Sequence, residues 1–243
     1  MKLSFSGKNS LVLGGSCETA LFLARLMIES QLFPILSYRN HDGQMRINDS
    51  LSSFDARKFE TILLDFSRKQ TIECLDDSTW QHLDYVIDFI QSDYESLIPG
   101  ASKQHIENYM TTNIINRAAL LQSISRTMLK RRKGRLIFIS STAAIKQNPG
   151  QGFYAAAKQA SEALYRNIGI EMGDRGVTTV SLRAGYIDSG RGKSYLNTHS
   201  KMKRFVLKTK EVAETILFLL SDSATGFNAT ELLFDKGLVA SKN

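Results

Sequence analysis

The chain alternates short, nearly continuous apolar runs with longer amphipathic stretches, and this alternation constrains its fold more than any other feature. The apolar runs are rich in β-branched or aliphatic side chains and lie at 10–13, 33–38, 61–64, 85–90, 135–140, 178–183 and 231–234. Apolar residues recur with helical spacing in the amphipathic stretches 19–30, 104–130, 154–172 and 211–220. Apolar strands separated by helices are typical of a parallel sheet covered on both faces. The sequence therefore predicts an α/β fold with a doubly wound parallel sheet of about seven strands.

Length and composition fit a single domain of this Rossmann type, spanning residues 1–243, with 42% hydrophobic residues. No run approaches the roughly 18 apolar residues of a membrane span, and the first residues do not resemble an export signal. Cys17 and Cys74 are far apart, and the four histidines are scattered. This pattern indicates neither a disulfide scaffold nor a metal site. We therefore expect a cytoplasmic protein that binds no metal and no membrane.

The formal charge of +7 raises the question of a nucleic-acid partner. Basic residues cluster at 129–135 and 201–210, but neither cluster is interleaved with the aromatic side chains that stack on bases. A basic run before a strand is more often a solvated helix end, so we do not expect a nucleic-acid binder. The charge equally suits an acidic partner protein or a phosphorylated cofactor.

The first apolar run continues into a glycine-containing turn, LGGSCETALFLARLM. Gly14 and Gly15 permit a tight turn, and the helix that follows offers unpaired N–H groups to an anionic pyrophosphate. A dinucleotide-binding loop usually has three spaced glycines, whereas Glu18 and Ala20 stand at the second and third positions here. A dinucleotide turn and an ordinary strand–turn–helix both fit. Cys17 in this turn is either a small loop filler or a redox-sensitive thiol.

Two further positions bear on a dinucleotide. An NAD site usually has an acid at the end of the second strand, where it binds the ribose hydroxyls. Arg39 stands there in this chain, and it is either a ligand for a ribose 2′-phosphate or a solvent-facing arginine. Asp65, after the third strand, is placed to meet the amino group of an adenine. These positions favour NADP(H) over NAD(H).

Tyr154 and Lys158 lie one turn apart in the stretch FYAAAKQASEAL. Positions i and i+4 share a helix face, and a cation beside a phenol lowers the phenol pKa from about 10. Such a tyrosine is a usable proton donor near neutral pH, although an ordinary surface pair is the alternative. Ser141 precedes Tyr154 by 13 residues, at the end of the fifth apolar run.

This spacing, with the surrounding residues, resembles the short-chain dehydrogenase/reductase family of oxidoreductases over nearly the whole chain. The resemblance places the catalytic asparagine of the family on Asn113. It implies that Ser141 binds the substrate carbonyl, that Tyr154 donates the proton, and that Lys158 lowers the tyrosine pKa and holds the nicotinamide ribose. Asn113 would anchor a water that links Lys158 to solvent. The implied cofactor contacts are Gly14, Gly15, Ser16, Thr19, Arg39, Asp65, Tyr154, Lys158, Gly185 and Ile187.

The chain departs from the family pattern on the cofactor side. Residues 88–91 read Asp-Phe-Ile-Gln where the family has an Asn-Ala-Gly run, and the other departures are Glu18, Ala20, Ala184, Ala229 and Lys236. Ser140, which would point away from Ser141, is assigned to packing or to a cofactor contact. The chain is either a divergent reductase or a catalytically degenerate subunit that serves as a structural or regulatory partner of an active homologue. The four intact catalytic positions favour the enzyme.

The resemblance is strongest to 3-oxoacyl-[acyl-carrier-protein] reductases, over residues 131–185. Those enzymes meet an acidic carrier protein through arginines at two helix ends, and Arg132 and Arg175 fall on the matching positions. The segment 185–210 would form a short basic lid over the substrate. The resemblance implies NADPH-dependent reduction of a β-ketoacyl thioester in fatty-acid or polyketide biosynthesis. It also implies a homodimer or homotetramer, or a mixed assembly with another member of the family.

Overall fold

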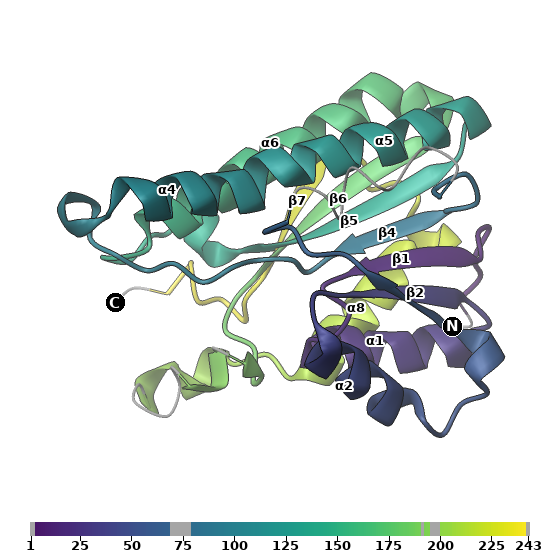
Figure 1. The fold of residues 1–243 in the computed structure, drawn as a ribbon, viewed down its shortest axis with the longest axis horizontal. Helices are drawn as coiled ribbons and strands as arrows, with labels where there is room; N and C mark the ends of the chain where they lie inside the picture. The colour runs from purple at the N-terminus through teal and green to yellow at the C-terminus, as the bar shows by residue number, and fades with distance from the viewer. Residues whose placement is uncertain (1–2, 69–78, 191, 195–199, 242–243) are drawn as a thin grey trace.

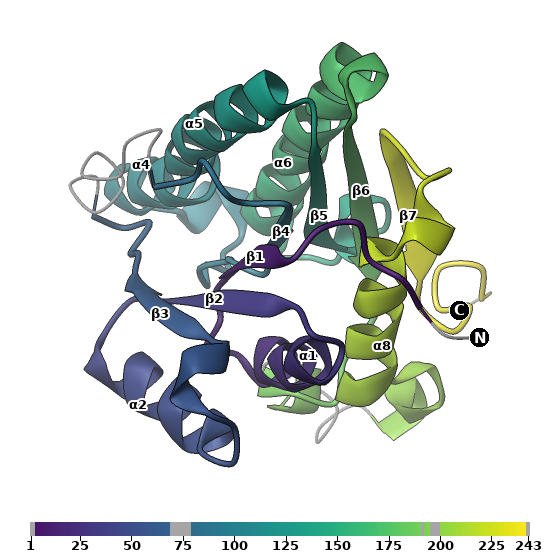
Figure 2. The ribbon, with the colours of Figure 1, turned by 90° about the vertical axis from the view of Figure 1, so that its right-hand side faces the viewer.

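The computed structural model describes residues 3–68, 79–190, 192–194 and 200–241. Within them, seven strands form one sheet in the order β3-β2-β1-β4-β5-β6-β7, and all neighbouring strands are parallel (Figure 1; all seven strands are labelled in Figure 2). The strand order reverses between β1 and β4, which confirms the predicted doubly wound sheet. The strands are β1 (Asn9–Leu13), β2 (Phe33–Tyr38), β3 (Glu60–Leu63), β4 (Tyr85–Asp88), β5 (Gly134–Ser141), β6 (Val177–Ala184) and β7 (Thr230–Phe234).

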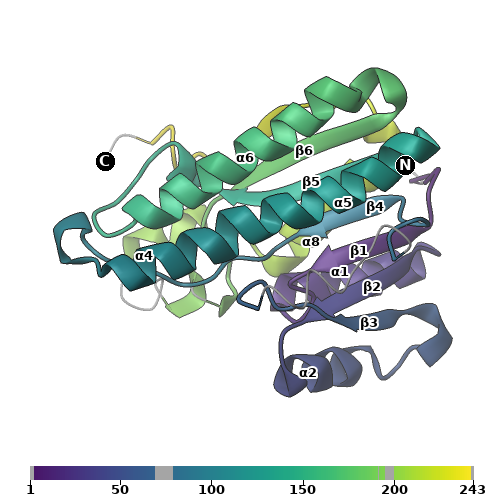
Figure 3. The ribbon, with the colours of Figure 1, turned by 45° about the horizontal axis from the view of Figure 1, so that its top comes forward.

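Helices cover both faces of the sheet (Figure 2). One layer contains α1 (Glu18–Glu29), α2 (His41–Leu51) and α8 (Thr209–Leu220). The other contains α4 (Lys103–Met110), the π-helical turn η3 (Thr111–Ile115), α5 (Asn116–Arg131) and α6 (Gly152–Met172). In Figure 3, α4 and α5 form one long rod beside α6. Short 3₁₀ helices are η1 (Ala56–Lys58), η2 (Ile98–Gly100), η4 (Thr142–Ala144), η5 (Gly173–Arg175), η6 (Ser200–Phe205) and η7 (Asp222–Ala224).

The two helical layers explain why the strands read as continuous apolar runs. Side chains alternate across a strand, so Val12 of β1 belongs to the core beneath α1 and α8, whereas Leu11 and Leu13 belong to the core beneath α5 and α6. The same alternation separates Ile137 from Phe138 in β5. Most positions of the inner strands are therefore buried.

The strand boundaries depart from the predicted ones at β4. The apolar run predicted a strand to residue 90, but β4 ends at Asp88. The Oδ1 atom of Asp88 accepts a hydrogen bond from the backbone N–H of Ile90 at 2.9 Å. This local bond turns the chain away from the sheet.

Two helical features were not predicted. The helix α2 is polar apart from the exposed Met45 and its buried positions Gly43, Ile47 and Leu51, which are spaced four residues apart. Its N-cap is Asn40, whose side chain accepts from the N–H of Gly43 at 3.0 Å. The stretch 104–130, predicted as one helix, is interrupted by the π-helical turn η3.

Two positions where the family has glycine carry a side chain in a left-handed backbone conformation. Ala229, just before β7, has φ of 50°, and Lys236, just after it, has φ of 51°. L-residues are strained in this region because Cβ approaches the following carbonyl oxygen. At both positions the backbone therefore adopts a conformation that favours glycine, although the residue there is alanine or lysine.

The described part of the chain has no helix of the length and apolar character needed to cross a membrane. In the same residues, no three histidine, cysteine or acidic side chains gather where a metal ion could be held.

Candidate active site

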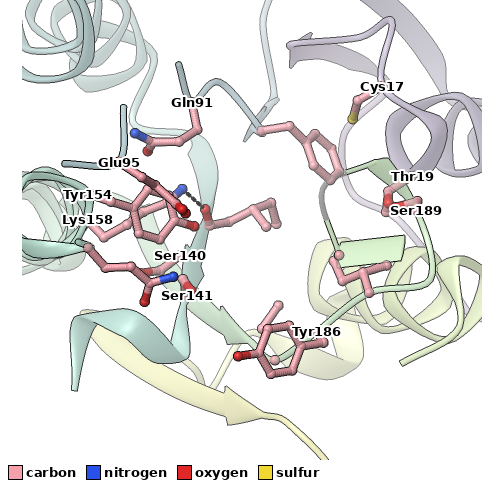
Figure 4. Close-up of a pocket in the computed structure, with 17 residues that line it drawn as sticks. Cys17, Thr19, Gln91, Glu95, Ser140, Ser141, Tyr154, Lys158, Tyr186 and Ser189 are labelled. Atoms are coloured by element: carbon pink, nitrogen blue, oxygen red, sulfur yellow. Dashed lines mark hydrogen bonds between the residues drawn. The ribbon is translucent and has the colours of Figure 1, made fainter. Parts of the chain in front are cut away.

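Two cavities lie side by side along the carboxyl ends of the strands, where the strand order reverses. The first has a volume of about 290 Å³ and the second about 340 Å³, and both are lined by Cys17, Phe89 and Gln91. Ligands of doubly wound sheets bind in this position. The remaining lining of the first cavity, shown in Figure 4, is Thr19, Glu95, Ile139, Ser140, Ser141, Gln151, Tyr154, Lys158, Ala184, Gly185, Tyr186, Ile187, Ser189 and Gly192.

Tyr154 and Lys158 lie on the wall of the first cavity, near the start of α6 (Figure 4). The ammonium of Lys158 is 5.8 Å from the centroid of the Tyr154 ring, so the pair meets as its spacing predicts. Lys158 is only 3% exposed and its Nζ donates to the backbone carbonyl of Ile139 at 2.7 Å. This burial is inconsistent with an ordinary surface pair.

Ser140 and Ser141 end β5 and have different partners. The Oγ of Ser141 accepts from the N–H of Ala143 at 3.2 Å, which leaves its hydroxyl hydrogen available on the cavity wall. The hydroxyl of Ser140 is buried and donates to Oε1 of Glu162 at 2.6 Å. Glu162 in turn is bound by Arg183 at 2.7 Å. This hydrogen bond fits the packing role predicted for Ser140, and because Ser140 also lines the first cavity its cofactor contact stays a prediction.

Asn113 lies in the π-helical turn η3 and is fully buried. Its Oδ1 accepts from the N–H of Ser92 at 3.0 Å and from Nε2 of Gln91 at 3.1 Å. Its Nδ2 donates to the carbonyl of Tyr109 at 2.8 Å, and its own carbonyl accepts from Arg117. Asn113 therefore holds the segment that follows β4, while its predicted water-anchoring role stays a prediction.

The glycine-containing turn has the geometry that a pyrophosphate needs. Gly14 has φ of 72°, and a Cβ on Gly15 would lie 2.6 Å from Cβ of Leu36, so both positions require glycine. Ser16 and Thr19 line the second and the first cavity respectively. The helix α1 begins next to them and presents its N-terminal N–H groups. Glu18, predicted to lie close to the phosphates, lines neither cavity and borders a separate hollow near α8.

The second cavity brings together the residues predicted for the adenosine side. Arg39 lines it at the end of β2, and Arg46 of α2 lines it as well. Asp65 lines it too, and its Oδ1 accepts from the backbone N–H and the hydroxyl of Ser67 at 2.9 and 2.7 Å. Guanidinium groups are well suited to bind a phosphate. The turn and this cavity therefore fit a phosphorylated dinucleotide.

A family model described as "Enoyl-(Acyl carrier protein) reductase" matches residues 20–239. The chain belongs to the short-chain dehydrogenase/reductase family of oxidoreductases. It is 24% identical over 241 residues to the 3-oxoacyl-[acyl-carrier-protein] reductase FabG of Chlamydia trachomatis, covering 95% of this chain and 97% of the relative. It is 26% identical over 202 residues to the peroxisomal 2,4-dienoyl-CoA reductase SPS19 of Saccharomyces cerevisiae, covering 78% of this chain and 65% of the relative.

Solved structures share the fold of this short-chain dehydrogenase/reductase. One described as a "short chain dehydrogenase/reductase family protein" superimposes with a TM-score of 0.86 at 23% identity and covers 99% of this chain and all of that one. Another, "ElxO with NADP Bound", has a TM-score of 0.85 at 19% identity and covers 97% of this chain and all of that one. These likenesses show that the chain has the family fold.

The short-chain dehydrogenase/reductase fold adds cavity residues that the sequence analysis did not name. Gly185 and Ile187 line the first cavity as the resemblance implies, and Tyr186 and Ser189 join them from the same loop. Ile187 forms a β-bridge with Leu207, and this bridge fixes the start of the proposed lid at 185–210. Residues 191 and 195–199 of that segment lie outside the described chain. Further lining residues that were not named include Arg46, Glu95 and Gln151, whereas Phe89 and Gln91 were named only as departures from the family pattern. The sequence could have indicated most of them by their nearness to named positions. Arg46 lies in helix α2, which was not predicted.

Cys17 lies at an exposed position of the turn, but neighbouring atoms desolvate its sulfur. Desolvation raises the pKa of the Cys17 thiol to about 11, although backbone hydrogen bonds from Ala20 and Thr19 partly oppose the shift. A thiol with this pKa is protonated at neutral pH and reacts slowly. The raised pKa fits the loop-filler interpretation, whereas the exposed position of Cys17 fits the redox-sensitive one.

Arg132 and Arg175 do not lie near the cleft of their own chain. Arg132 caps the end of α5 and Arg175 ends η5, and each comes just before the amino end of a strand, β5 or β6. Tyr154 is near the opposite end of α6, and the 21-residue length of that helix corresponds to about 30 Å. The two arginines thus form a pair at the edge of the sheet opposite the cavities.

Proposed function

We propose that the chain is an NADPH-dependent reductase of a ketone, with a β-ketoacyl thioester on a carrier protein as the favoured substrate. One observation carries the proposal. Ser141, Tyr154 and the buried Lys158 line one cavity, and that cavity adjoins a second one lined by Arg39 and Arg46. The residues proposed to act on the substrate and those proposed to select the cofactor therefore line adjacent cavities of one cleft.

The catalytic groups have complementary tasks in this proposal. When bound, NADPH supplies the hydride that reduces the carbonyl carbon. The Ser141 hydroxyl donates a hydrogen bond to the carbonyl oxygen and stabilises the negative charge that develops there. The Tyr154 hydroxyl gives its proton to that oxygen, which completes the alcohol. The Lys158 ammonium, held by the carbonyl of Ile139, stabilises the phenolate that remains.

The preference for NADPH follows from the charges around the second cavity. Arg39 and Arg46 contribute two guanidinium groups and Ser16 a hydroxyl to its wall. Charge-assisted hydrogen bonds of this kind bind a phosphate strongly. The ribose of NADH has no phosphate at its 2′ position, so we expect NADH to bind more weakly.

The carrier-bound substrate is supported by the curated relatives named as 3-oxoacyl-[acyl-carrier-protein] reductases and by the net positive charge. Arg132 and Arg175 are too far from their own Tyr154 to present a carrier to it. A two-fold axis across α5 and α6 would bring the end of one α6 close to the start of another. We therefore propose that a carrier docked on this arginine pair serves the cleft of a second copy.

The test combines cofactor binding with turnover. The purified protein is titrated with NADPH and NADH by fluorescence, and NADPH oxidation is followed with a carrier-bound β-ketoacyl substrate and with free ketones. Tight NADPH binding and turnover of the carrier-bound substrate are expected. Turnover of free ketones alone would overturn the substrate assignment. No binding of either cofactor would overturn the reductase proposal and favour a degenerate partner subunit.

A further inference from the structure

A buried ion pair lies between the sheet and α6, close to the first cavity but outside its lining. Arg117 of α5 and Asp88 at the end of β4 have side chains that are 1% and 0% exposed, and Nε of Arg117 donates to Oδ2 of Asp88 at 2.7 Å. The hydroxyl of Tyr165 donates to the same oxygen at 3.0 Å. Burial raises the pKa of this phenol well above its ordinary value, and the neighbouring Asp88 carboxylate raises it further, so Tyr165 remains a hydrogen-bond donor.

The remaining N–H groups of Arg117 contact three other segments. Nη1 donates to the backbone carbonyl of Asn113 and to the hydroxyl of Ser161 at 3.0 Å. Nη2 donates to the backbone carbonyl of Ile90. Ser161 follows Lys158 by three residues on α6, so it shares the face that carries the lysine. One guanidinium thus joins the end of β4, the segment after it, the π-helical turn and α6.

The segments that Arg117 contacts form the wall of the cleft. Ile90 lies between Phe89 and Gln91, and those two residues line both cavities. Asn113 binds Gln91 and the N–H of Ser92 through its side chain, so it holds the same wall from behind. The π-helical turn η3, a local departure from α-helical pairing, also packs against α6.

A buried guanidinium needs partners for its remaining N–H groups, whatever its role. What distinguishes Arg117 is where those partners lie. Its further donors bind Asn113, Ile90 and Ser161, and each of these belongs to a segment that forms or backs the cleft. The geometry supplies a mechanical link between the pair and the cleft.

We propose that Arg117 is a positioning residue that fixes the wall 89–92 and the turn at Asn113 against α6. It acts through these segments and does not touch substrate or cofactor. The inference rests on the proposed function only for its catalytic readout, because the position of the wall can be measured without any ligand.

The decisive variant is the double substitution Asp88→Asn with Arg117→Met. Arg117→Met alone would leave a buried carboxylate without its cation and could simply unfold the chain. The double variant removes both charges and retains the shape of the core. We expect it to melt close to the wild-type Tm, with faster amide hydrogen exchange in 89–92. The Kd for NADPH should rise about tenfold and kcat should fall about 10- to 100-fold, with a smaller change in KM.

The control is Asp84→Asn with Arg131→Met, the same change in a less buried pair at the opposite end of β4 and α5, where Asp84 also binds Lys133 at 3.0 Å. Arg131 binds Asp84 at 2.7 Å, far from both cavities. This control should keep wild-type kinetic constants and wild-type exchange in 89–92 whatever its Tm.

Wild-type exchange, Kd and kcat in a folded Asp88→Asn/Arg117→Met variant would overturn the inference. If that variant does not fold, Arg117→Lys decides, because an ammonium keeps the charge beside Asp88 but cannot reproduce the fork of contacts. Wild-type behaviour of Arg117→Lys would then overturn it. Turnover is measured with any carbonyl compound that the wild type reduces. If the wild type does not reduce the carrier-bound substrate, that result affects the proposed function alone. If the wild type shows no turnover at all, amide hydrogen exchange in 89–92 still tests the inference.

Discussion

Lys158 donates to the backbone carbonyl of Ile139 at 2.7 Å, two residues before Ser141 on the same strand. The end of β5 therefore sets the positions of both the ammonium and the hydroxyl that act on a substrate carbonyl. A shift of this strand end would move both groups together. Their relative geometry is thus a property of the sheet and not of a flexible loop.

Ser141→Ala should lower kcat about 10²- to 10³-fold, because it removes a donor to the developing oxyanion. NADPH binding should be unchanged, and steady-state kinetics with a cofactor titration measures both. Ser140→Ala is the neighbouring comparison. It removes the donor to Glu162 and should lower stability by about 1–3 kcal/mol with at least a tenfold smaller loss of kcat. Equal losses of kcat in the two variants would contradict the separate roles given to these serines.

Arg39→Ala combined with Arg46→Ala should weaken NADPH binding about 10- to 100-fold and leave NADH binding nearly unchanged. The lost interactions are charge-assisted hydrogen bonds to the 2′-phosphate. Arg25→Ala is the control for loss of a surface arginine and removes one charge, since Arg25 lines neither cavity and binds Ser50. Fluorescence titration measures each Kd. An equal loss for NADPH and NADH would show that the two arginines do not select the phosphate.

Ala229→Gly should stabilise the fold by about 1 kcal/mol, because glycine adopts positive φ without strain. Glycine also gains unfolded-state entropy, which limits the benefit. For a chain of this size the Tm should rise by about 2–4 °C in a thermal melt. Ala119→Gly, at an exposed position of helix α5, should lower Tm by a similar amount. A fall of Tm in both variants would argue against strain at Ala229.

Cys17 should react slowly with iodoacetamide at neutral pH, because the pKa of its thiol is raised to about 11 by desolvation. Only the thiolate is nucleophilic. The labelling rate should therefore increase about tenfold for each pH unit from pH 7 to 10. Mass spectrometry in a Cys74→Ser background reports on Cys17 alone. Rapid labelling that is independent of pH in this range would mean an ionised, redox-capable thiol.

The strands could be predicted from the sequence because burial on both faces leaves a continuous apolar run. The end of β4 could not, because the apolar run continues through Phe89 and Ile90 while the side chain of Asp88 turns the chain. The helix α2 was missed because its buried face consists of Gly43, Ile47 and Leu51 alone. Arg46 was missed with it. Sparse burial on a peripheral helix leaves too little periodicity to recognise.

The candidate site was predictable where its residues are close in sequence. Tyr154 and Lys158 are one helical turn apart, and their shared face follows from helical geometry. The link between Asp88 and Arg117 could not be predicted in this way. The two are 29 residues apart, and an arginine within a helix is normally interpreted as solvent-facing. Only the tertiary packing shows that it is buried and shared among four segments.

The burial of Asp88 and Arg117 also limits how this chain can change over generations. A single substitution that neutralises either residue leaves a buried charge without its partner, at a cost of about 3–5 kcal/mol, which is a large part of a typical domain's stability. Only a paired change avoids that intermediate. The two positions are therefore expected to mutate together among descendants of this sequence.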